Sequence, residues 1–473
     1  MRAPAALSIL AALLISFGCA AQNGRESSTG PPNIVLIVAD DLGWTDVGAY
    51  GTEFYETPHI DRLAREGIRF LSAYANPNCA PTRAALLTGR YSPRTGIYTV
   101  GSGARGQEEF RAMVPAENVT DLAVSEVVFA EPIRAAGYRT AHMGKWHMGT
   151  GEFAPENQGF DLNIGGNDSG SPRGGYFAPW ENPQLQPGAE GEHLADRLAD
   201  RAVEFIQAED ERPFLLYLPF YSVHTPIQAK ADLEAKYAAK PPTGGHSNPK
   251  YAAMVETLDT AIGRVLAALD ESGVADHTVV LFTSDNGGLG GYAAAGVDNR
   301  IEVTTNAPLR GGKGMLYEGG VRVPLIVRWP GVSPPGATCM EPVGSVDFFP
   351  TLLEIARADR SGVDTIDGRS FTNLIRDGRG QEPRPPIYWH FPGYLEARAQ
   401  TGAWRTTPGG AVLEGNFKLI EFFETGQLEL YDLEEDIGEK VNLAESNPAK
   451  AQELYGKLLA WRAETNAPMP TAK

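Results

Sequence analysis

The 473-residue sequence is poor in zinc-binding residues, with three cysteines and eight histidines. It has neither an HExxH motif nor the Cys/His spacing of a zinc site, which argues against catalytic Zn²⁺. Cys19 lies in an apolar N-terminal segment. The sequence leaves two alternatives open for Cys79: a disulfide with Cys339, or a chemical role of its own.

Excess positive charge and long apolar runs are also absent. The formal net charge is −18 and the pI is ≈ 5.0, so a general binder of nucleic acid or anionic membranes is not expected. An anionic substrate would have to be bound by a few local cations. The apolar run at residues 5–17 is too short to span a bilayer. No internal repeat stands out.

The N-terminus is typical of an export signal. Arg2 precedes the apolar run, and small residues with Cys19 follow it. We expect residues 1–21 to be a signal peptide and residues 22–32 a flexible tether. Either Cys19 is lipidated or the signal is cut after Ala21. The protein is then expected in the periplasm or on the surface of a bacterium, with membrane contact only through the lipid.

Buried-strand patterns alternate with helical patterns, which predicts an α/β fold with a mainly parallel sheet flanked by helices. The strands are expected at 33–39, 214–219, 278–283 and 323–328, and the helices at 57–66, 125–136, 194–208 and 252–270. We expect a catalytic domain at 33–375, a Pro-rich boundary near 376–387 and an α+β subdomain with an antiparallel sheet at 388–473. Its predicted elements are strands at 417–423 and 427–433 and a helix at 448–465.

Two polar pairs follow predicted strands. Asp40 and Asp41 come after the first, and Asp285 and Asn286 come after the strand at 278–283. Ligand sites of parallel sheets lie beyond the carboxyl ends of strands, and hard oxygen ligands suit Ca²⁺ or Mg²⁺. Solvated turns are the alternative. Both neighbours Asp40 and Asp41 can face one ion only if the chain turns there, and Gly43 would help.

Residues 79–83 (CAPTR), followed by LLTGR at 86–90, carry the most specific pattern. Cys79 and Arg83 are separated by three residues, whereas a phosphatase-type cysteine loop needs five. The segment resembles the C-x-P-S/T-R and L-x-T-G-R signature of the type I, formylglycine-dependent sulfatases of the alkaline phosphatase superfamily. The resemblance implies that a formylglycine-generating maturation enzyme oxidises Cys79 to formylglycine (3-oxoalanine).

The resemblance extends over nearly all of the chain after the tether. Blocks at 32–43, 137–149, 223–226, 283–287, 309–320 and 429–442 are similar to the family in order. Ile437 departs from a frequent Pro. The implied ligands of one Ca²⁺ are Asp40, Asp41, Cys79, Asp285 and Asn286. The implied catalytic residues are Cys79, Arg83, Lys145, His147, His224 and Lys313.

The resemblance implies an alkaline-phosphatase-like fold and a sulfuric ester hydrolase. Lys145 and Lys313 would bind sulfate oxygens, and Arg83 would support the hydrated formylglycine. One hydroxyl of that group would attack sulfur while His224 protonates the departing oxygen. His147 would then help to deprotonate the second hydroxyl, which expels sulfate.

A sulfated carbohydrate is the expected substrate, with a sulfated galactose or N-acetylgalactosamine unit as the narrower expectation. One alternative is a phosphonate or phosphodiester hydrolase of the same superfamily. The other is a non-catalytic lipoprotein that binds sulfated glycans. The loops at 167–173 and 390–393 could line a sugar subsite, although surface loops are favoured slightly.

Overall fold

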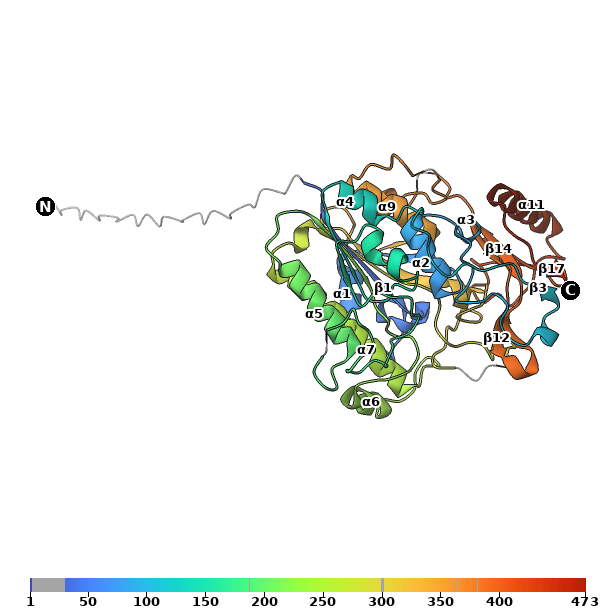
Figure 1. Cartoon of the computed structure of the whole chain (residues 1–473), viewed down its shortest axis with the longest axis horizontal. Helices are drawn as coiled ribbons and strands as arrows, with labels where there is room; N and C mark the ends of the chain where they lie inside the picture. The colour runs from blue at the N-terminus through green and yellow to red at the C-terminus, as the bar shows by residue number, and fades with distance from the viewer. Residues whose placement is uncertain (2–29, 187, 299–301, 364, 381) are drawn as a thin grey trace. The chain divides into compact units, whose positions relative to one another are not determined.

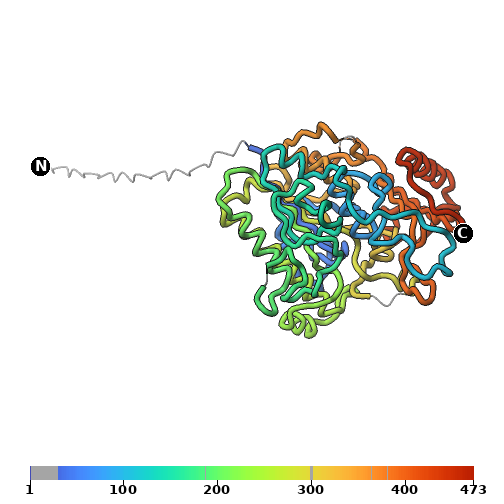
Figure 2. The backbone as a smooth tube through the Cα atoms, in the orientation of Figure 1, coloured from blue at the N-terminus to red at the C-terminus, as the bar shows by residue number. Residues whose placement is uncertain are grey.

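The computed structural model describes residues 1, 30–186, 188–298, 302–363, 365–380 and 382–473. Residues 31–473 form one compact unit (Figures 1 and 2). Apart from Met1, the predicted signal peptide lies outside the described residues, as do Cys19 and nearly all of the tether. Within the described part of the chain, no helix has the length and apolar character needed to span a membrane.

A mixed sheet forms the centre of this unit. Its strand order is β10-β2-β8-β7-β1-β6-β4-β5, and β9 pairs with β2. Strand β1 is parallel to both β6 and β7, whereas β8 is antiparallel to β7 and β2. The predicted mixed, mainly parallel sheet is therefore confirmed. The strands are β1 (Asn33–Ala39), β2 (Ile68–Tyr74), β4 (Arg139–Met143), β5 (Leu162–Ile164), β6 (Phe214–Pro219), β7 (Thr278–Ser284), β8 (Arg322–Arg328), β9 (Ala337–Cys339) and β10 (Val343–Gly344).

Helices cover both faces of the sheet (Figure 1). Strand β1 is buried throughout and alternates between two cores. Val35 and Ile37 belong to one core, and Leu36 and Val38 belong to the other, as the period of two in a strand requires. The first core includes α1 (Pro58–Glu66), α5 (Leu194–Gln207) and α7 (Pro249–Glu271), and the second includes α2 (Cys79–Thr88), α4 (Ala130–Ala135) and α9 (Phe348–Ala356).

The helix predicted at 125–136 is shorter in the structure. Helix α4 spans only Ala130–Ala135, and Pro132 lies in its first turn. Proline has no N–H, and its ring would clash with the carbonyl four residues earlier if the helix began at residue 125. The Glu131 side chain instead accepts a hydrogen bond from the Val128 amide at 3.0 Å, which fixes the helix start.

A second, antiparallel sheet has the order β11-β14-β15-β16. Leu454 and Leu458 of α11 (Pro448–Thr465) pack on Val412 and Leu419 of this sheet. The predicted antiparallel sheet and closing helix are confirmed, while the domain limits of 33–375 and 388–473 stay a prediction. The strands are β11 (Ile387–Phe391), β14 (Gly409–Glu414), β15 (Phe417–Phe422) and β16 (Gln427–Asp432).

Smaller elements complete the unit. Strands β12 (Leu395–Arg398) and β13 (Ala403–Thr406) pair with each other, and β3 (Met113–Val114) pairs with β17 (Thr471–Ala472). Short helices are α3 (Ser92–Thr95), α6 (Ala231–Ala238), α8 (Glu318–Val321) and α10 (Thr372–Asp377). The 3-10 helices are Trp44–Asp46, Gly48–Tyr50, Glu108–Phe110, Gly151–Phe153, Pro155–Asn157, Ala275–His277, Ser345–Asp347 and Ala399–Thr401.

Buried ion pairs join the second sheet to the first. Lys418 of β15 lies 2.8 Å from Glu318 and 3.0 Å from Glu439. Glu318 also pairs with Arg322 of β8 at 2.6 Å. Burial raises the pKa of Glu439 to about 7. Because buried charges are costly without partners, these contacts fix the position of the chain that leads into β8.

Asp259 of α7 provides a pH-dependent link to α1. Its buried carboxyl group accepts the amides of His59 and Ile60 at the start of α1. Burial, with the nearby carboxylates of Asp61 and Glu256, raises the pKa of Asp259 to about 7. The folded protein therefore holds this proton more tightly than the unfolded chain, in which an aspartate has a pKa of about 3.9.

Preferential protonation of Asp259 in the folded protein contributes to the free energy of unfolding. The contribution is at its maximum below about pH 3.9 and is lost as the pH rises through about 7. Between about pH 5 and pH 7, wild type should lose stability relative to Asp259→Asn by up to about 1.4 kcal/mol per pH unit. Urea unfolding across this range measures the difference. Thr260→Ala, on the exposed face of the same helix, should keep the wild-type slope, and equal slopes for wild type and Asp259→Asn would contradict the prediction.

Candidate active site

The register of β1 and β7 brings the two predicted polar pairs together. Ala39 pairs with Ser284 at the carboxyl ends of these parallel strands, so Asp40 and Asp285 follow side by side. The Asp41 amide donates to Asp285 Oδ1 at 3.2 Å. The carboxylates of Asp40, Asp41 and Asp285, which we call the carboxylate cluster, are fully buried.

The backbone of Asp41 makes the turn that brings its own side chain to the carboxylate cluster. Its φ is +61°, in the left-handed region that aspartate tolerates better than most residues. Gly43, expected to help this turn, has a φ of −69°, so it does not supply the left-handed conformation, but a Cβ there would lie only 2.6 Å from Asn306 Oδ1. The amide of Gly43 instead donates to Asp46 at 2.9 Å, which holds the chain after the turn.

Helix α2 presents Cys79 and Arg83 to the carboxylate cluster. Residues four apart lie on one face of a helix, and both of these side chains are buried. Arg83 donates to Asp285 Oδ2 from Nη2 at 2.7 Å and from Nε at 3.1 Å. Its Nη1 donates to the Lys145 carbonyl at 2.8 Å. Arg83 therefore neutralises Asp285 and positions the loop of Lys145.

Two lysines neutralise the other two carboxylates. Lys145 Nζ lies 2.6 Å from Asp40 Oδ2, and Lys313 Nζ lies 2.6 Å from Asp41 Oδ1. Lys313 Nζ also donates to Cys79 Sγ at 3.3 Å. Burial alone would raise the pKa of Asp41, but Lys313 and His224 hold that pKa well below its usual range. The Lys313 ammonium group thus lies where an anion would meet Cys79, whereas Lys145 is fully buried and is not among the residues that line the cavity at this site.

His224 is partly exposed, with 18% of its side chain accessible, and its Nε2 lies 3.8 Å from Asp41 Oδ2. Its Nδ1 lies 2.6 Å from the Thr225 carbonyl, which assigns the ring proton to Nδ1 because a carbonyl only accepts. Burial, together with Lys313, lowers the pKa of His224 to about 3. The ring is neutral at neutral pH, and Nε2 is free to accept a proton.

His147 is buried, and its Nδ1 has no hydrogen-bond partner among the described residues. Burial is the main cause that lowers the pKa of His147 well below its usual value, and the positive charge of Lys145 is the second. A Cβ at Gly170 would lie 2.5 Å from the His147 ring. Glycine at position 170 is therefore what allows the 167–173 loop to pass the ring.

Cys79 and Cys339 are both free, so the disulfide left open by the sequence is not formed. Burial raises the pKa of Cys79 to about 11, against the effect of Lys145 and Lys313. The sulfur is therefore a neutral thiol at neutral pH. Since the thiolate is the reactive form of cysteine, unmodified Cys79 is a weak nucleophile here.

The donor set suits a hard cation. Asp40 Oδ1, Asp41 Oδ2 and Asn286 Oδ1 are buried and have no hydrogen-bond partner among the described residues. Burial, and then repulsion from Asp285, raises the pKa of Asp40 well above its usual value, so further positive charge would stabilise its ionised form. Unpaired buried oxygens of this kind are the ligands that Ca²⁺ prefers.

Most of the predicted metal ligands lie together, with one addition and one exception. Asp285 is outside the group, and its Oδ1 and Oδ2 accept hydrogen bonds from the Asp41 amide and from Arg83. Ligand atoms of Asp40, Asp41, Cys79 and His224 lie within 4.8 Å of one another. Asn286 joins them through its side-chain amide, which donates to Asp41 Oδ1 at 2.8 Å. The sequence did not predict His224 in this group. A histidine nitrogen suits Ca²⁺ less well than oxygen, so we leave His224 outside the ligand set.

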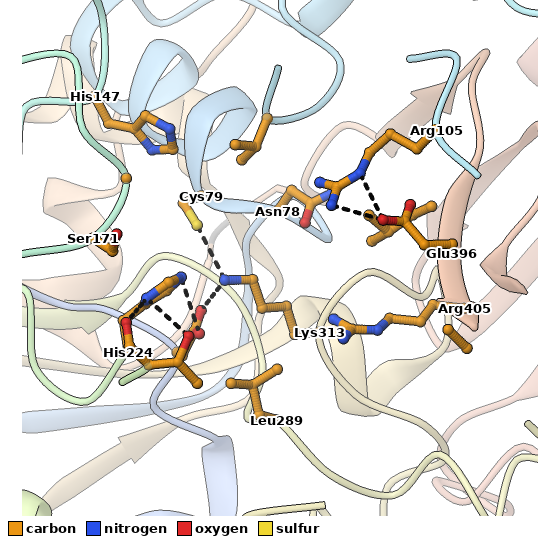
Figure 3. A pocket seen from close by; sticks show the side chains of 16 residues that line it. Asn78, Cys79, Arg105, His147, Ser171, His224, Leu289, Lys313, Glu396 and Arg405 are labelled. Atoms are coloured by element: carbon orange, nitrogen blue, oxygen red, sulfur yellow. Dashed lines mark hydrogen bonds and ion pairs between the residues drawn. The ribbon is translucent and has the colours of Figure 1, made fainter. Parts of the chain in front are cut away.

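A cavity of about 510 Å³ opens above these groups. Cys79 and Lys313 point toward each other, with His147 and His224 on one side (Figure 3). From the loop at 167–173, Gly170 and Ser171 line the cavity, so this loop does reach the site. The loop at 390–393 does not line this cavity, and His390 packs against Trp461 and Phe423 instead.

The opposite wall holds residues that the sequence did not single out. Arg105, Glu396 and Arg405 line the cavity there (Figure 3). Glu396 and Arg405 come from β12 and β13, more than 300 positions after Cys79 in the chain of 473 residues. They lie in no recognisable motif, so only the fold could bring them to the site.

Buried cations, carboxylates and a cysteine beyond the ends of parallel strands define an enzyme that acts on an anionic ester. The sequence model of the Sulfatase family matches residues 32–358, and that of "N-sulphoglucosamine sulphohydrolase, C-terminal" matches residues 312–463. The chain belongs to the Sulfatase family and is a sulfuric ester hydrolase. This assignment sets aside the alternative of a non-catalytic glycan-binding protein.

Known proteins are similar to this one over most of the chain. A sulfatase from Formosa agariphila is 35% identical over 97% of this chain and 94% of its own length. Human N-acetylgalactosamine-6-sulfatase is 34% identical over 77% of this chain and 70% of its own. The crystal structure of Ps i-CgsB in complex with k-i-k-neocarrahexaose is 28% identical, with a TM-score of 0.75 over 94% of this chain and 95% of the other.

Calcium should stabilise the fold through these oxygens. At a free concentration about 100 times Kd, a bound ion adds about 2.7 kcal/mol to the free energy of unfolding. Asp40→Asn should lose most of the Ca²⁺-dependent rise in melting temperature. Without the ion it should unfold at a lower temperature than wild type, because the buried Lys145 ammonium group loses its partner Asp40.

Thermal unfolding with a chelator and with added Ca²⁺ measures both effects. Asp270→Asn is the matched control, because Asp270 is an exposed carboxylate at the end of α7 that pairs with Arg62. It should keep the full response to Ca²⁺. An equal response in wild type and Asp40→Asn, or none in wild type, would rule out this metal site.

Proposed function

We propose that this enzyme hydrolyses sulfate esters of carbohydrates, with a formylglycine made from Cys79 as the nucleophile and one bound Ca²⁺. The observation that carries the proposal is the position of Cys79. It lines the cavity, 3.3 Å from the Lys313 ammonium group and near the carboxylates of Asp40 and Asp41, each of which has an unpaired oxygen. A sulfate group there would meet positive charge and a nucleophile together.

Two groups must be added to the polypeptide. Asp40, Asp41, Asp285 and Asn286 would hold Ca²⁺ with residue 79, and the ion supplies positive charge toward the sulfate oxygens. Formylglycine supplies a hydrated aldehyde with two hydroxyl groups on one carbon, where serine or cysteine has a single group. A maturation enzyme that recognises residues 79–83 would be the partner that makes it.

Charged side chains bind and orient the ester. Lys145 and Lys313 would donate to the sulfate oxygens, because both ammonium groups border the cluster at 2.6 Å from a carboxylate. Arg83 is fully buried and is held by Asp285, so its role is to fix charge and geometry under residue 79. Fixed cations in a site shielded from water favour the charge that develops during ester cleavage.

The two histidines move protons. The Nε2 of His224 borders the cavity, and a bound sulfate ester would raise the low pKa of His224 by stabilising the imidazolium. His224 can then protonate the oxygen of the departing sugar. His147 is neutral with an unpartnered Nδ1, so it can accept a proton from a hydroxyl of residue 79 when sulfate leaves.

A sugar ester is the substrate that the cavity and the relatives support. A volume of about 510 Å³ falls in the usual range for small-molecule sites. The Ps i-CgsB structure holds a neocarrahexaose, and a second relative is an N-acetylgalactosamine-6-sulfatase. A sulfated galactose or N-acetylgalactosamine unit is therefore the first choice.

Export is also part of the proposal. The pattern at residues 1–21 supports secretion to the periplasm or cell surface, with lipidation of Cys19 or cleavage after Ala21. Sulfated glycans from outside the cell would reach the enzyme there, and a lipid on Cys19 would be its membrane contact.

Turnover of sulfate esters should require the oxidation of Cys79 to formylglycine. Co-expression with a formylglycine-generating enzyme should change the mass of the peptide that contains residue 79. The converted enzyme should release sulfate from one member of a panel of sulfated galactose, galactosamine, glucosamine, uronate and fucose units. Cys79→Ser should lower turnover by more than about 1,000-fold, because its single hydroxyl cannot expel sulfate.

Peptide mass and inorganic sulfate are the two measurements. Cys339→Ser is the matched control, since Cys339 is a buried free thiol on β9 outside the cavity lining. It should retain conversion and turnover. Wild-type turnover by Cys79→Ser would refute the proposed mechanism.

Replacement of His224 should depend on the leaving group. A sugar alkoxide needs a proton when the ester bond breaks, whereas a nitrophenolate leaves without one. His224→Gln should therefore lower kcat about 100-fold or more on a sugar sulfate and about tenfold or less on nitrophenyl sulfate. Steady-state kinetics with both esters measure this, and equal losses would argue against His224 as the acid.

A further inference from the structure

The wall of the cavity opposite the histidines carries two arginines. Arg105 comes from the loop after α3, and Arg405 comes from β13. Both guanidinium groups point into the cavity, beside Asn78 and Lys313 (Figure 3). Neither residue belongs to the set that would bind the reacting sulfate, so this wall has a separate purpose.

The charges on this wall are not balanced. Lys313 is paired with Asp41 at 2.6 Å, and Arg105 is paired with Glu396 at 2.9 Å. Arg405 forms no ion pair and no hydrogen bond with any residue in the described part of the chain, and its Nε is buried without a partner. The protein has a formal net charge of −18, so a cation left unpaired in its active-site cavity is a specific feature.

Packing holds Arg405 next to the catalytic lysine. A Cβ at Gly314, the residue after Lys313, would lie 3.5 Å from Arg405 Cδ. That distance is an ordinary van der Waals contact, whereas the same Cβ would clash with Leu395, and the φ of Gly314, +91°, favours glycine. The Arg405 guanidinium carbon lies 5.0 Å from the centre of the Tyr292 ring, and the Tyr292 hydroxyl donates to the Lys313 carbonyl at 2.9 Å.

These contacts hold the Arg405 side chain of β13 beside the loop that carries Lys313, the lysine that would bind the reacting sulfate. A planar guanidinium with free donors fits a carboxylate or a sulfate through two parallel hydrogen bonds. A second anionic group on the same saccharide could reach it while the first sulfate lies against Lys313 and residue 79. A neutral sugar could offer hydroxyl oxygens to this guanidinium, but only an anionic group would also balance its charge.

We propose that Arg405 is a specificity residue that binds a second anionic group of the substrate, either a sulfate or a carboxylate. This inference rests on the proposed function and narrows its substrate class to saccharides with two anionic groups. Arg105 is held by Glu396 and forms the side of this subsite, and Arg405 supplies its free charge.

Three disaccharides of the same backbone test the proposal. One carries only the cleaved sulfate, one carries a second sulfate, and one carries a uronic acid beside the sulfated sugar. Wild type should hydrolyse one of the two dianionic substrates with a kcat/KM at least tenfold above that of the monosulfated one. The preferred dianion then identifies the second group as sulfate or carboxylate.

Arg405→Gln should reduce this ratio at least tenfold, which corresponds to about 1.4 kcal/mol, and Arg405→Lys should reduce it less. The matched control is Arg201→Gln on α5, because Arg201 pairs only with Glu204 one turn away among the described residues. It should keep the wild-type ratio and both rates.

The outcomes separate the two proposals. Release of sulfate with no preference for a dianion, or a preference that survives in Arg405→Gln and Arg405→Lys, overturns the role of Arg405 and leaves the proposed function intact. If fully converted wild type releases sulfate from none of the three saccharides or the monosaccharide panel, the proposed function fails, and this inference fails with it.

Discussion

Three carboxylates that lie together away from water, those of Asp40, Asp41 and Asp285, are the constraint on which the rest of the active site depends. The pairing of β1 with β7 makes their proximity unavoidable. An unpaired buried charge costs on the order of several kcal/mol. Each carboxylate therefore has its own cation, and those cations come from three separate loops or helices. The fold assembles the site by balancing charge.

Charge balance also explains why the second sheet matters to the chemistry. Lys418 of that sheet is buried between Glu318 and Glu439. Glu318 begins α8, the short helix that follows the loop of Lys313. Lys418 of the second sheet therefore holds in place the segment that carries Lys313 to the carboxylate cluster at the first sheet. The far wall of the cavity, where Arg405 lies, comes in part from the separate two-stranded sheet β12-β13.

Local patterns made much of this arrangement predictable. The strands at 33–39 and 214–219 and the helix at 448–465 have the predicted limits, because continuous apolar runs and clear helix boundaries leave few choices. The predicted site residues also meet at one place. The sequence did not show three features of direction and distance: the turn at Asp41, the late start of α4 at Ala130, and the position of Arg405 in the cavity wall. These depend on backbone strain, ring sterics and contacts between distant segments.

The central claim is that this arrangement of charged side chains is suited to the hydrolysis of sulfate esters. The most direct test compares sulfate release from a sulfated saccharide with phosphonate release from an aryl phosphonate ester, using Ca²⁺-loaded protein fully converted at residue 79. The account predicts that kcat/KM for the sulfate ester is the larger by at least about tenfold. A larger kcat/KM for the phosphonate ester would contradict it and would favour a phosphonate hydrolase built on the same fold.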